Sequence, residues 1–241
     1  SPSGWRKDNL SFTAAYSYHL VNPSYEDDRF KEMYGVVPHY GRILKSTTGS
    51  SLVAVHNFRG SISWWPAKYI HFQFGKDKNF WGDGYRSLFL SDNAASYPFL
   101  KGTVNIWKIK YVMLWSAHKG DDSDFPGIHF ENKYASSHFL SWNIGNRLNL
   151  NMFETVVWRG EDSLGKRGFD VNYINPIIFF RPVEFSLGSP DNVIMGIGGR
   201  LRVFKTTHLY GQFLLVEFKL EPIKAADGWW GNEFGVQAGI K

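Results

Sequence analysis

Apolar and polar residues alternate one by one along most of this chain, and this period of two constrains the fold more than any other feature. A β-strand places successive side chains on opposite faces, so the alternation predicts strands with one apolar and one polar face. Between residues 9 and 20 the apolar set is Leu10, Phe12, Ala14, Tyr16, Tyr18 and Leu20, and the polar set is Asn9, Ser11, Thr13, Ser17 and His19. Residues 233–241 repeat the pattern, so the sequence predicts an all-β protein.

Further strands are expected between these two. The predicted ranges are 35–45, 51–65, 68–76, 103–118, 133–145, 146–158, 171–186, 192–204 and 207–220. Several reach the ~9–11 residues that a tilted strand needs to cross a bilayer. Short turn signals alternate with longer polar segments, which is typical of the two ends of an outer-membrane barrel. We therefore expect an antiparallel transmembrane outer-membrane β-barrel.

The segment 103–118 favours a barrel over a soluble sandwich. One set of alternate positions holds Trp107, Ile109, Tyr111, Met113 and Trp115, and the set between them includes Lys108 and Lys110. Unpaired lysines in a dry core are costly, whereas in a water-filled barrel they cost little. Residues 207–220 likewise place Tyr210, Leu214 and Val216 on one face, and we expect these apolar faces to point outward to lipid.

Composition excludes several classes of protein. Aromatic residues make up 17% of the chain, as membrane barrels require at the lipid–water boundary. The chain has no cysteine, which rules out disulfides and cysteine-ligated metals. Its net charge of +5 is spread out, so no nucleic-acid patch is predicted. No apolar run is long enough for a membrane helix, and we predict no catalytic residue, cofactor or metal site.

The strand count and the chain end point to part of a larger structure. We count roughly eleven candidate strands, whereas single-chain bacterial barrels use even numbers. The alternation is also still running at Lys241. We therefore expect residues 1–241 to form a single β-barrel domain that is an incomplete part of a longer chain.

The alternation breaks down at residues 79–102, which we interpret as an ordered internal loop or plug that fills or narrows the barrel. Gly82 and Gly84 permit positive φ on both sides of Asp83, so the backbone can fold tightly there. The alternative is a sugar-contacting surface, because aromatic rings stack on sugars and planar polar groups bind hydroxyls. The candidate ligand-binding residues are Trp81, Asp83, Tyr85, Arg86, Asp92 and Asn93, together with Trp158 and Arg159 in a second polar segment at 158–173.

The block "FWGDGYRSLFLSDN" and the later stretches "SSHFLSWNIGNRLNLNMFETVVWRG" and "GWWGNEFGVQAGIK" resemble the Wzi-like capsule-assembly outer-membrane proteins. The likeness is to their Bacteroidetes branch, which includes gliding-motility barrels of the RemB type. It covers nearly the whole chain in order.

The resemblance implies a protein of the bacterial outer membrane without catalytic activity. Its expected role is to attach or organise surface polysaccharide, or a cell-surface or secretion complex. The expected partners are outer-membrane lipid, a surface polysaccharide and such complexes, with no nucleic acid. Two alternatives stay open: a soluble β-sandwich that binds or hydrolyses carbohydrate, and a porin-like channel.

Overall fold

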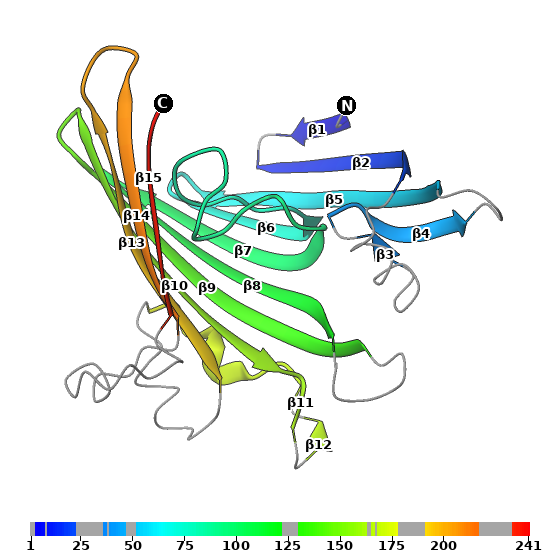
Figure 1. Ribbon diagram of the computed structural model, residues 1–241. Coiled ribbons are helices and arrows are strands. Elements are labelled where there is room, and N and C mark those ends of the chain that lie inside the picture. The colour runs from blue at the N-terminus through cyan, green and yellow to red at the C-terminus, as the bar shows by residue number, and fades with distance from the viewer. Residues whose placement is uncertain are drawn as a thin grey trace.

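A single large antiparallel sheet dominates the computed structural model (Figure 1). The structure describes residues 3–7, 9–22, 36–37, 39–46, 52–121, 130–162, 165–166, 168–177, 191–216 and 233–241. The elements are β1 (Ser3–Lys7), β2 (Leu10–Val21), β3 (Val36–Val37), β4 (Gly41–Ser46), β5 (Val53–Ala67), β6 (Ile70–Asp77), β7 (Tyr97–Ile106), β8 (Ile109–Asp121), β9 (Phe130–Ile144), β10 (Leu148–Arg159), β11 (Glu161–Asp162), β12 (Gly165–Lys166), the 3-10 helix η1 (Val171–Ile174), β13 (Asn192–Arg202), β14 (His208–Val216) and β15 (Glu233–Ile240). The all-β, antiparallel prediction is confirmed.

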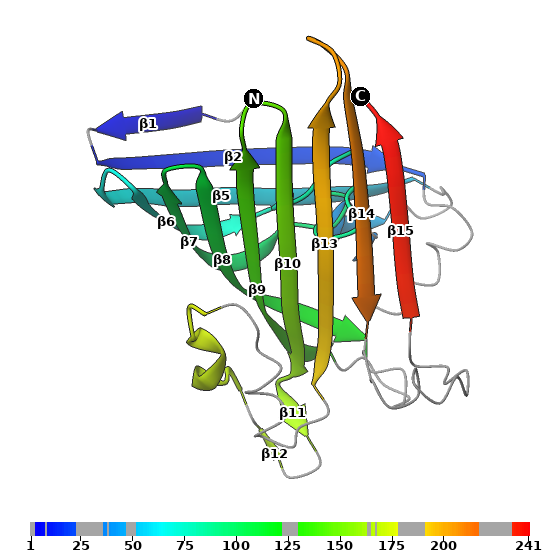
Figure 2. The ribbon, with the colours of Figure 1, turned by 90° about the vertical axis from the view of Figure 1, so that its left-hand side faces the viewer.

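The main sheet has 13 strands, and consecutive long strands pair with each other. Its path runs β1-β2-β5-β6-β7-β8-β9-β10-β13-β14-β15, with β3 and β4 attached beside β5. Among the described strands, no pairing joins β1 to β15, so the sheet does not close. It curves strongly, with a concave inner face and a convex outer face (Figures 1 and 2). In the described part of the chain, no helix is long and apolar enough to cross a membrane.

Short and long connections alternate, as the sequence predicts. The turns at 68–69, 107–108, 145–147 and 203–207 lie at one end of the strands. The longer connections, including 78–96 and 160–191, leave from the other end. Figure 2 shows the β9–β10 and β13–β14 turns at one end and β11, β12 and η1 at the opposite end.

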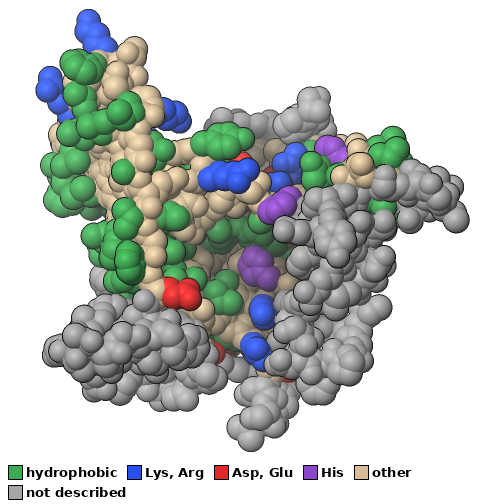
Figure 3. All heavy atoms as spheres, in the orientation of Figure 1, with side chains coloured by type: hydrophobic (Ala, Val, Ile, Leu, Met, Phe, Trp, Pro, Cys, Tyr) green, Lys and Arg blue, Asp and Glu red, His purple; other side chains and the backbone are tan. Residues whose placement is uncertain are grey.

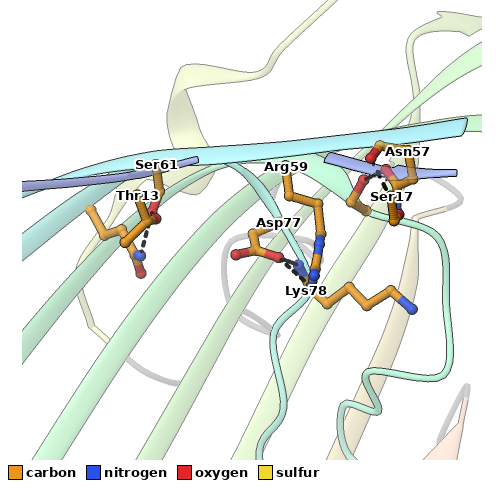
Figure 4. A network of polar contacts seen from close by, with 9 residues as sticks. Thr13, Ser17, Asn57, Arg59, Ser61, Asp77 and Lys78 are labelled. Atoms are coloured by element: carbon orange, nitrogen blue, oxygen red, sulfur yellow. Dashed lines mark hydrogen bonds and ion pairs between the residues drawn. The ribbon is translucent and has the colours of Figure 1, made fainter. Parts of the chain in front are cut away.

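The two faces of the sheet differ in chemistry. Cross-strand pairs such as Ile62 with Phe74 and Phe213 with Val236 project from the outer face. The exposed apolar residues of this face include Leu10, Phe12, Tyr16, Tyr18, Leu20, Phe58, Ile62, Trp64, Ile70, Phe72, Phe74, Leu100, Ile109, Ile197, Leu209, Phe213, Phe234, Val236 and Ile240. On the inner face, polar side chains bond across the strands: Thr13 Oγ1 lies 2.9 Å from Ser61 Oγ, which accepts from Gln73 Nε2 at 2.9 Å (Figure 4).

Several sequence expectations about the strands are wrong. Residues 35–45 are not one strand, because β3 and β4 pair with each other as a hairpin. Residues 103–118 are not one strand, because Trp107 takes a left-handed φ of 54° and turns the chain between β7 and β8. Lys108 therefore lies in a turn, while Lys110 does face inward. Residues 97–102 begin β7 instead of continuing a loop. Val171–Ile174 form η1, not a strand; residues 178–186 of that prediction lie outside the described residues.

The expected orientation of 207–220 is also reversed. Leu214 packs against the cluster on the inner face, and Tyr210 contacts the loop that lies there. The residues between them, Leu209, Phe213 and Leu215, face outward, in register with Leu201, Ile197 and Met195. The reason is that both sets of alternate positions in this strand carry apolar residues, so the pattern alone does not specify which set meets the interior.

Candidate functional site

Residues 78–96 connect β6 to β7 and lie in the hollow of the sheet, where Figure 1 shows them as the coiled trace beside β6 and β7. We call this segment the inner loop. An isolated bridge holds its two arms together, with Trp81 N donating to Leu90 O at 3.0 Å. The loop lies on the inner face instead of extending away from the sheet, so it fills part of the hollow.

An apolar cluster attaches the inner loop to the sheet. The Trp81 ring stacks on Phe139 of β9 with centroids 5.7 Å apart, and the Phe89 ring stacks on Phe153 of β10 at 5.3 Å. The cluster comprises Trp81, Phe89, Tyr97, Phe99, Val112, Leu114, Phe139 and Phe153, with Leu88, Leu90, Ile194 and Leu214 packed against it. All eight central residues are less than a tenth exposed. Such burial makes the loop a structural part of the inner face.

Glycines on both sides permit this close approach. A Cβ at Gly196 of β13 would lie 2.4 Å from Phe89 Cε1, and one at Gly198 would lie 3.1 Å from Phe89 Cζ. On the loop, Gly82 and Gly84 have φ of 108° and 95°, as their spacing predicts. A Cβ on Gly84 would lie 2.9 Å from the Tyr210 ring of β14. The loop backbone therefore fits directly onto β14 and the Phe89 ring onto β13.

Polar contacts specify the position of the loop. Buried Gln212 of β14 accepts from Leu88 N at 2.9 Å through Oε1 and donates to Ser87 Oγ at 3.0 Å through Nε2. Arg200 Nη1 lies 3.1 Å from Asp83 Oδ1, and Gln237 Nε2 donates to Arg86 O at 2.7 Å. Asp83 thus pairs with the sheet and not within the loop.

Four of the candidate residues line a single cavity of about 720 Å³ between the inner loop and the strands β14 and β15. They are Tyr85, Arg86, Asp92 and Asn93, joined by Phe80, Gly84, Tyr210, Ile240 and Lys241. Tyr85 is 88% exposed, and its ring has the Arg86 guanidinium 5.9 Å from its centroid. An exposed ring beside amide, carboxylate and cationic groups has the chemistry of a sugar-binding surface.

The remaining candidates lie elsewhere. Trp81 belongs to the buried cluster, and Asp83 is held by Arg200. Trp158 is 2% exposed and lies on the outer face, so its ring is not available to a sugar in the cavity. Arg159 ends β10 at the long-loop end of the sheet.

Trp158 belongs to a second structure, which the sequence does not predict. Residues 168–177, here the outer segment, cover the outer face of β8, β9 and β10. Tyr173, fully buried, packs on Trp158 with centroids 4.7 Å apart. Its carbonyl oxygen accepts from Trp115 Nε1 at 2.9 Å and from Ser136 Oγ at 2.8 Å. Tyr111 Oη similarly donates to Pro176 O at 2.8 Å.

The outer segment shields polar side chains that point away from the hollow. His138 of β9 and Glu154 of β10 are cross-strand partners on the outer face, yet both are at most 1% exposed. In their place the segment exposes Val171, Ile174 and Ile177. An apolar outer surface is thereby continued over a polar part of the sheet.

The inner face carries mostly positive charge. Its basic strand residues include Arg59, Lys101, Lys110, Lys133, Arg159 and Arg200. Among the strand residues whose side chains the structure describes, the acidic ones on this face are Asp77 and Glu233, and Asp77 lies 3.5 Å from Arg59 (Figure 4). Figure 3 shows Lys, Arg and His side chains in the hollow and hydrophobic side chains over the outer side of the sheet.

Residues distant in sequence complete the cavity and the loop contacts. Tyr210, Gln212 and Gly196 lie more than 100 residues from the loop they contact, so no local pattern identifies them. Tyr210 and Gln212 both occupy even positions of the strand at 208–216. The alternation of a strand therefore predicts that they share a face.

Comparison with models of protein families gave no match, and comparison with curated proteins gave none either. Among solved structures, the chain is similar to an anion-selective porin from Comamonas acidovorans, with 11% sequence identity and a TM-score of 0.44. The similarity covers 96% of this chain and 58% of the porin, so this chain spans less than two thirds of that protein's length.

Proposed function

We propose that this chain forms the wall and the filled interior of an outer-membrane β-barrel of the capsule-assembly and gliding-motility type. In this proposal it attaches or organises a surface polysaccharide or a cell-surface protein complex and performs no catalysis. The membrane location is supported by the outer face, where rings such as Phe58, Phe74 and Phe213 are exposed while polar side chains occupy the inner face.

One observation carries the choice of a filled barrel over an open channel. The inner loop is bound to the sheet by a buried aromatic cluster and by a buried glutamine, Gln212, that bonds two loop residues. A gate that opens would be expected to make few buried contacts. The loop instead has the packing of a permanent part of the interior.

Liposome conductance tests this choice with the full protein. The unchanged protein should give little steady conductance, and a Trp81→Ala/Phe89→Ala variant, whose loop loses its main apolar contacts, should give more. Tyr69→Ala, in the exposed β5–β6 turn, is the control and should conduct as the unchanged protein does. A large, steady conductance of the unchanged protein would favour the porin-like channel instead.

Polymer contact is assigned to the cavity beside the inner loop. Tyr85 is its most exposed ring, and loss of one stacked ring should lower affinity by about 0.5–1.5 kcal/mol. We expect Tyr85→Ala to weaken retention of the native surface polysaccharide by cells or purified protein, with Tyr69→Ala as the control. Equal retention by both variants would remove the cavity from the proposal.

A further inference from the structure

Three basic side chains surround one point on the inner face of β6, β7 and β8. His71 of β6 lies opposite Thr103 of β7, and Lys101 is the next inward residue along β7. Lys110 of β8 lies opposite Asn105, the inward residue on the other side of Thr103. Lys101 is thus a diagonal neighbour of His71, and Lys110 is a diagonal neighbour of Thr103. Such neighbours are ~7–8 Å apart, within reach of long side chains. The charges of Lys101 and Lys110 both act on His71.

The hydrogen bonds around this cluster leave two buried nitrogen atoms without partners. Lys101 Nζ donates to Asn79 Oδ1 at 2.9 Å. An ammonium group can only donate, so the atom of the Asn79 amide that faces Lys101 is the oxygen. The Nδ2 atom of Asn79 therefore points away from Lys101. Asn79 is only 5% exposed; its amide interacts with the Tyr97 hydroxyl, but its Nδ2 forms no hydrogen bond of normal geometry. The Nε2 atom of His71 is buried without a partner too.

In the described part of the chain, the acidic side chain that acts on this cluster is Asp77, through Lys101. Asp77, the acidic residue of β6 on this face, accepts from Lys78 N at 2.8 Å and lies 3.5 Å from Arg59. Lys110 forms no ion pair or side-chain hydrogen bond with the described residues. Several positive charges beside buried nitrogen atoms without hydrogen bonds favour a negatively charged acceptor at this point.

We propose that Lys101, Lys110, His71 and Asn79 form a binding site for a carboxylate or phosphate group. The ammonium groups supply charge, and the buried amide of Asn79 supplies a donor at a fixed position. Trp65, whose ring stacks on His71 with centroids 4.5 Å apart, forms an aromatic neighbour. This proposal rests on the proposed function in one respect: it requires that water and solutes reach the inner face of the sheet. The anionic group belongs either to an acidic polysaccharide or to a small solute.

Equilibrium binding to the full protein in detergent tests the site, with three probes: a galacturonate oligosaccharide, a neutral glucose oligosaccharide of the same length, and inorganic phosphate. We expect the unchanged protein to prefer galacturonate over the neutral chain, with an affinity that falls as salt is added. The Lys101→Gln/Lys110→Gln variant should bind galacturonate about tenfold or more weakly, because it loses hydrogen bonds between charged groups. Lys76→Gln is the matched control, because Lys76 projects from the other face of β6 at an exposed position.

Asn79→Asp separates recognition from folding. The new carboxylate keeps the acceptor for Lys101 Nζ but replaces the amide donor with a negative oxygen. We expect it to abolish anion binding while the free energy of unfolding in urea stays close to that of the unchanged protein.

Binding of galacturonate alone assigns the site to an acidic polymer, and equal binding of phosphate assigns it to a small anion. Binding that is insensitive to both lysines and to Asn79→Asp, or equal affinity for the neutral chain, overturns the site. The conductance of the unchanged protein and of its inner-loop variant decides the proposed function separately.

Discussion

At the scale of single residues, the contact between Gly196 and Phe89 makes the attachment of the inner loop testable. Gly196→Ala would place a methyl group 2.4 Å from Phe89 Cε1, so either the ring or β13 has to move. Overpacking of this kind costs about 1–3 kcal/mol. We expect the free energy of unfolding, measured by urea titration in detergent, to fall by that amount.

Gly211→Ala is the control for this prediction. Gly211 lies on the neighbouring strand, and an added Cβ would meet only Gln237 O, at 3.8 Å. Its stability should be unchanged or slightly higher, because alanine restricts the unfolded chain more than glycine does. Equal losses for the two alanine variants would mean that Phe89 does not occupy the position described.

The Asp83–Arg200 pair should matter far less than the apolar contacts. The two side chains are 11% and 47% exposed, and pairs with this access to water contribute about 0–1 kcal/mol. We expect Asp83→Asn to lower the free energy of unfolding by less than about 1 kcal/mol, and the difference from the unchanged protein to shrink further in high salt. A loss as large as that of Gly196→Ala would show that the ion pair, not the cluster, holds the loop.

At the scale of elements, the outer segment depends on Tyr173. Its ring is fully buried against Trp158, and its hydroxyl donates to Asp191 Oδ2 at 2.6 Å. Tyr173→Ala removes both contacts and should cost about 3–5 kcal/mol, whereas Tyr173→Phe loses only the hydroxyl bond and should cost about 1–2 kcal/mol. Urea titration followed by tryptophan fluorescence measures both. Similar, small losses for the two variants would contradict the packing of this segment on the sheet.

Elements also show what the sequence can and cannot predict. Regular alternation at residues 9–20 and 233–241 predicts both the strand and the inward set of side chains, because only one set is apolar. The turn at Trp107 cannot be predicted from the sequence, because a tryptophan, not the usual glycine or asparagine, takes the left-handed φ there. In β14 both sets are apolar, so the inward choice of Leu214 depends on packing against Phe89 and its neighbours in the cluster.

The candidate site divides in the same way. Tyr85, Arg86, Asp92 and Asn93 are close in sequence, so their meeting in one cavity follows from a local fold of the loop. The contributions of Tyr210 and Lys241 depend on long-range pairing that no local pattern specifies. Trp158 has a structural role instead, because the outer segment folds back over the sheet and buries its ring.

At the scale of the whole molecule, the proposed barrel requires that neighbouring residues of one strand meet lipid and water in turn. Phe74 and Gln73 of β6 test this requirement. Phe74 is 65% exposed on the outer face, while Gln73 points inward and donates to Ser61 Oγ at 2.9 Å. A lysine facing lipid near the middle of the bilayer costs about 2–4 kcal/mol, whereas one facing the interior keeps its water.

We therefore expect Phe74→Lys to make folding into phospholipid vesicles less favourable by about 2–4 kcal/mol. Gln73→Lys should cost about 1 kcal/mol, for the hydrogen bond to Ser61 alone. In detergent micelles, which adapt to a charge at the surface more readily than a bilayer does, the gap between the variants should narrow. A protein that stays monodisperse in buffer without detergent, and in which Phe74→Lys is harmless, would be a soluble sheet whose exposed rings meet water or a partner instead of lipid.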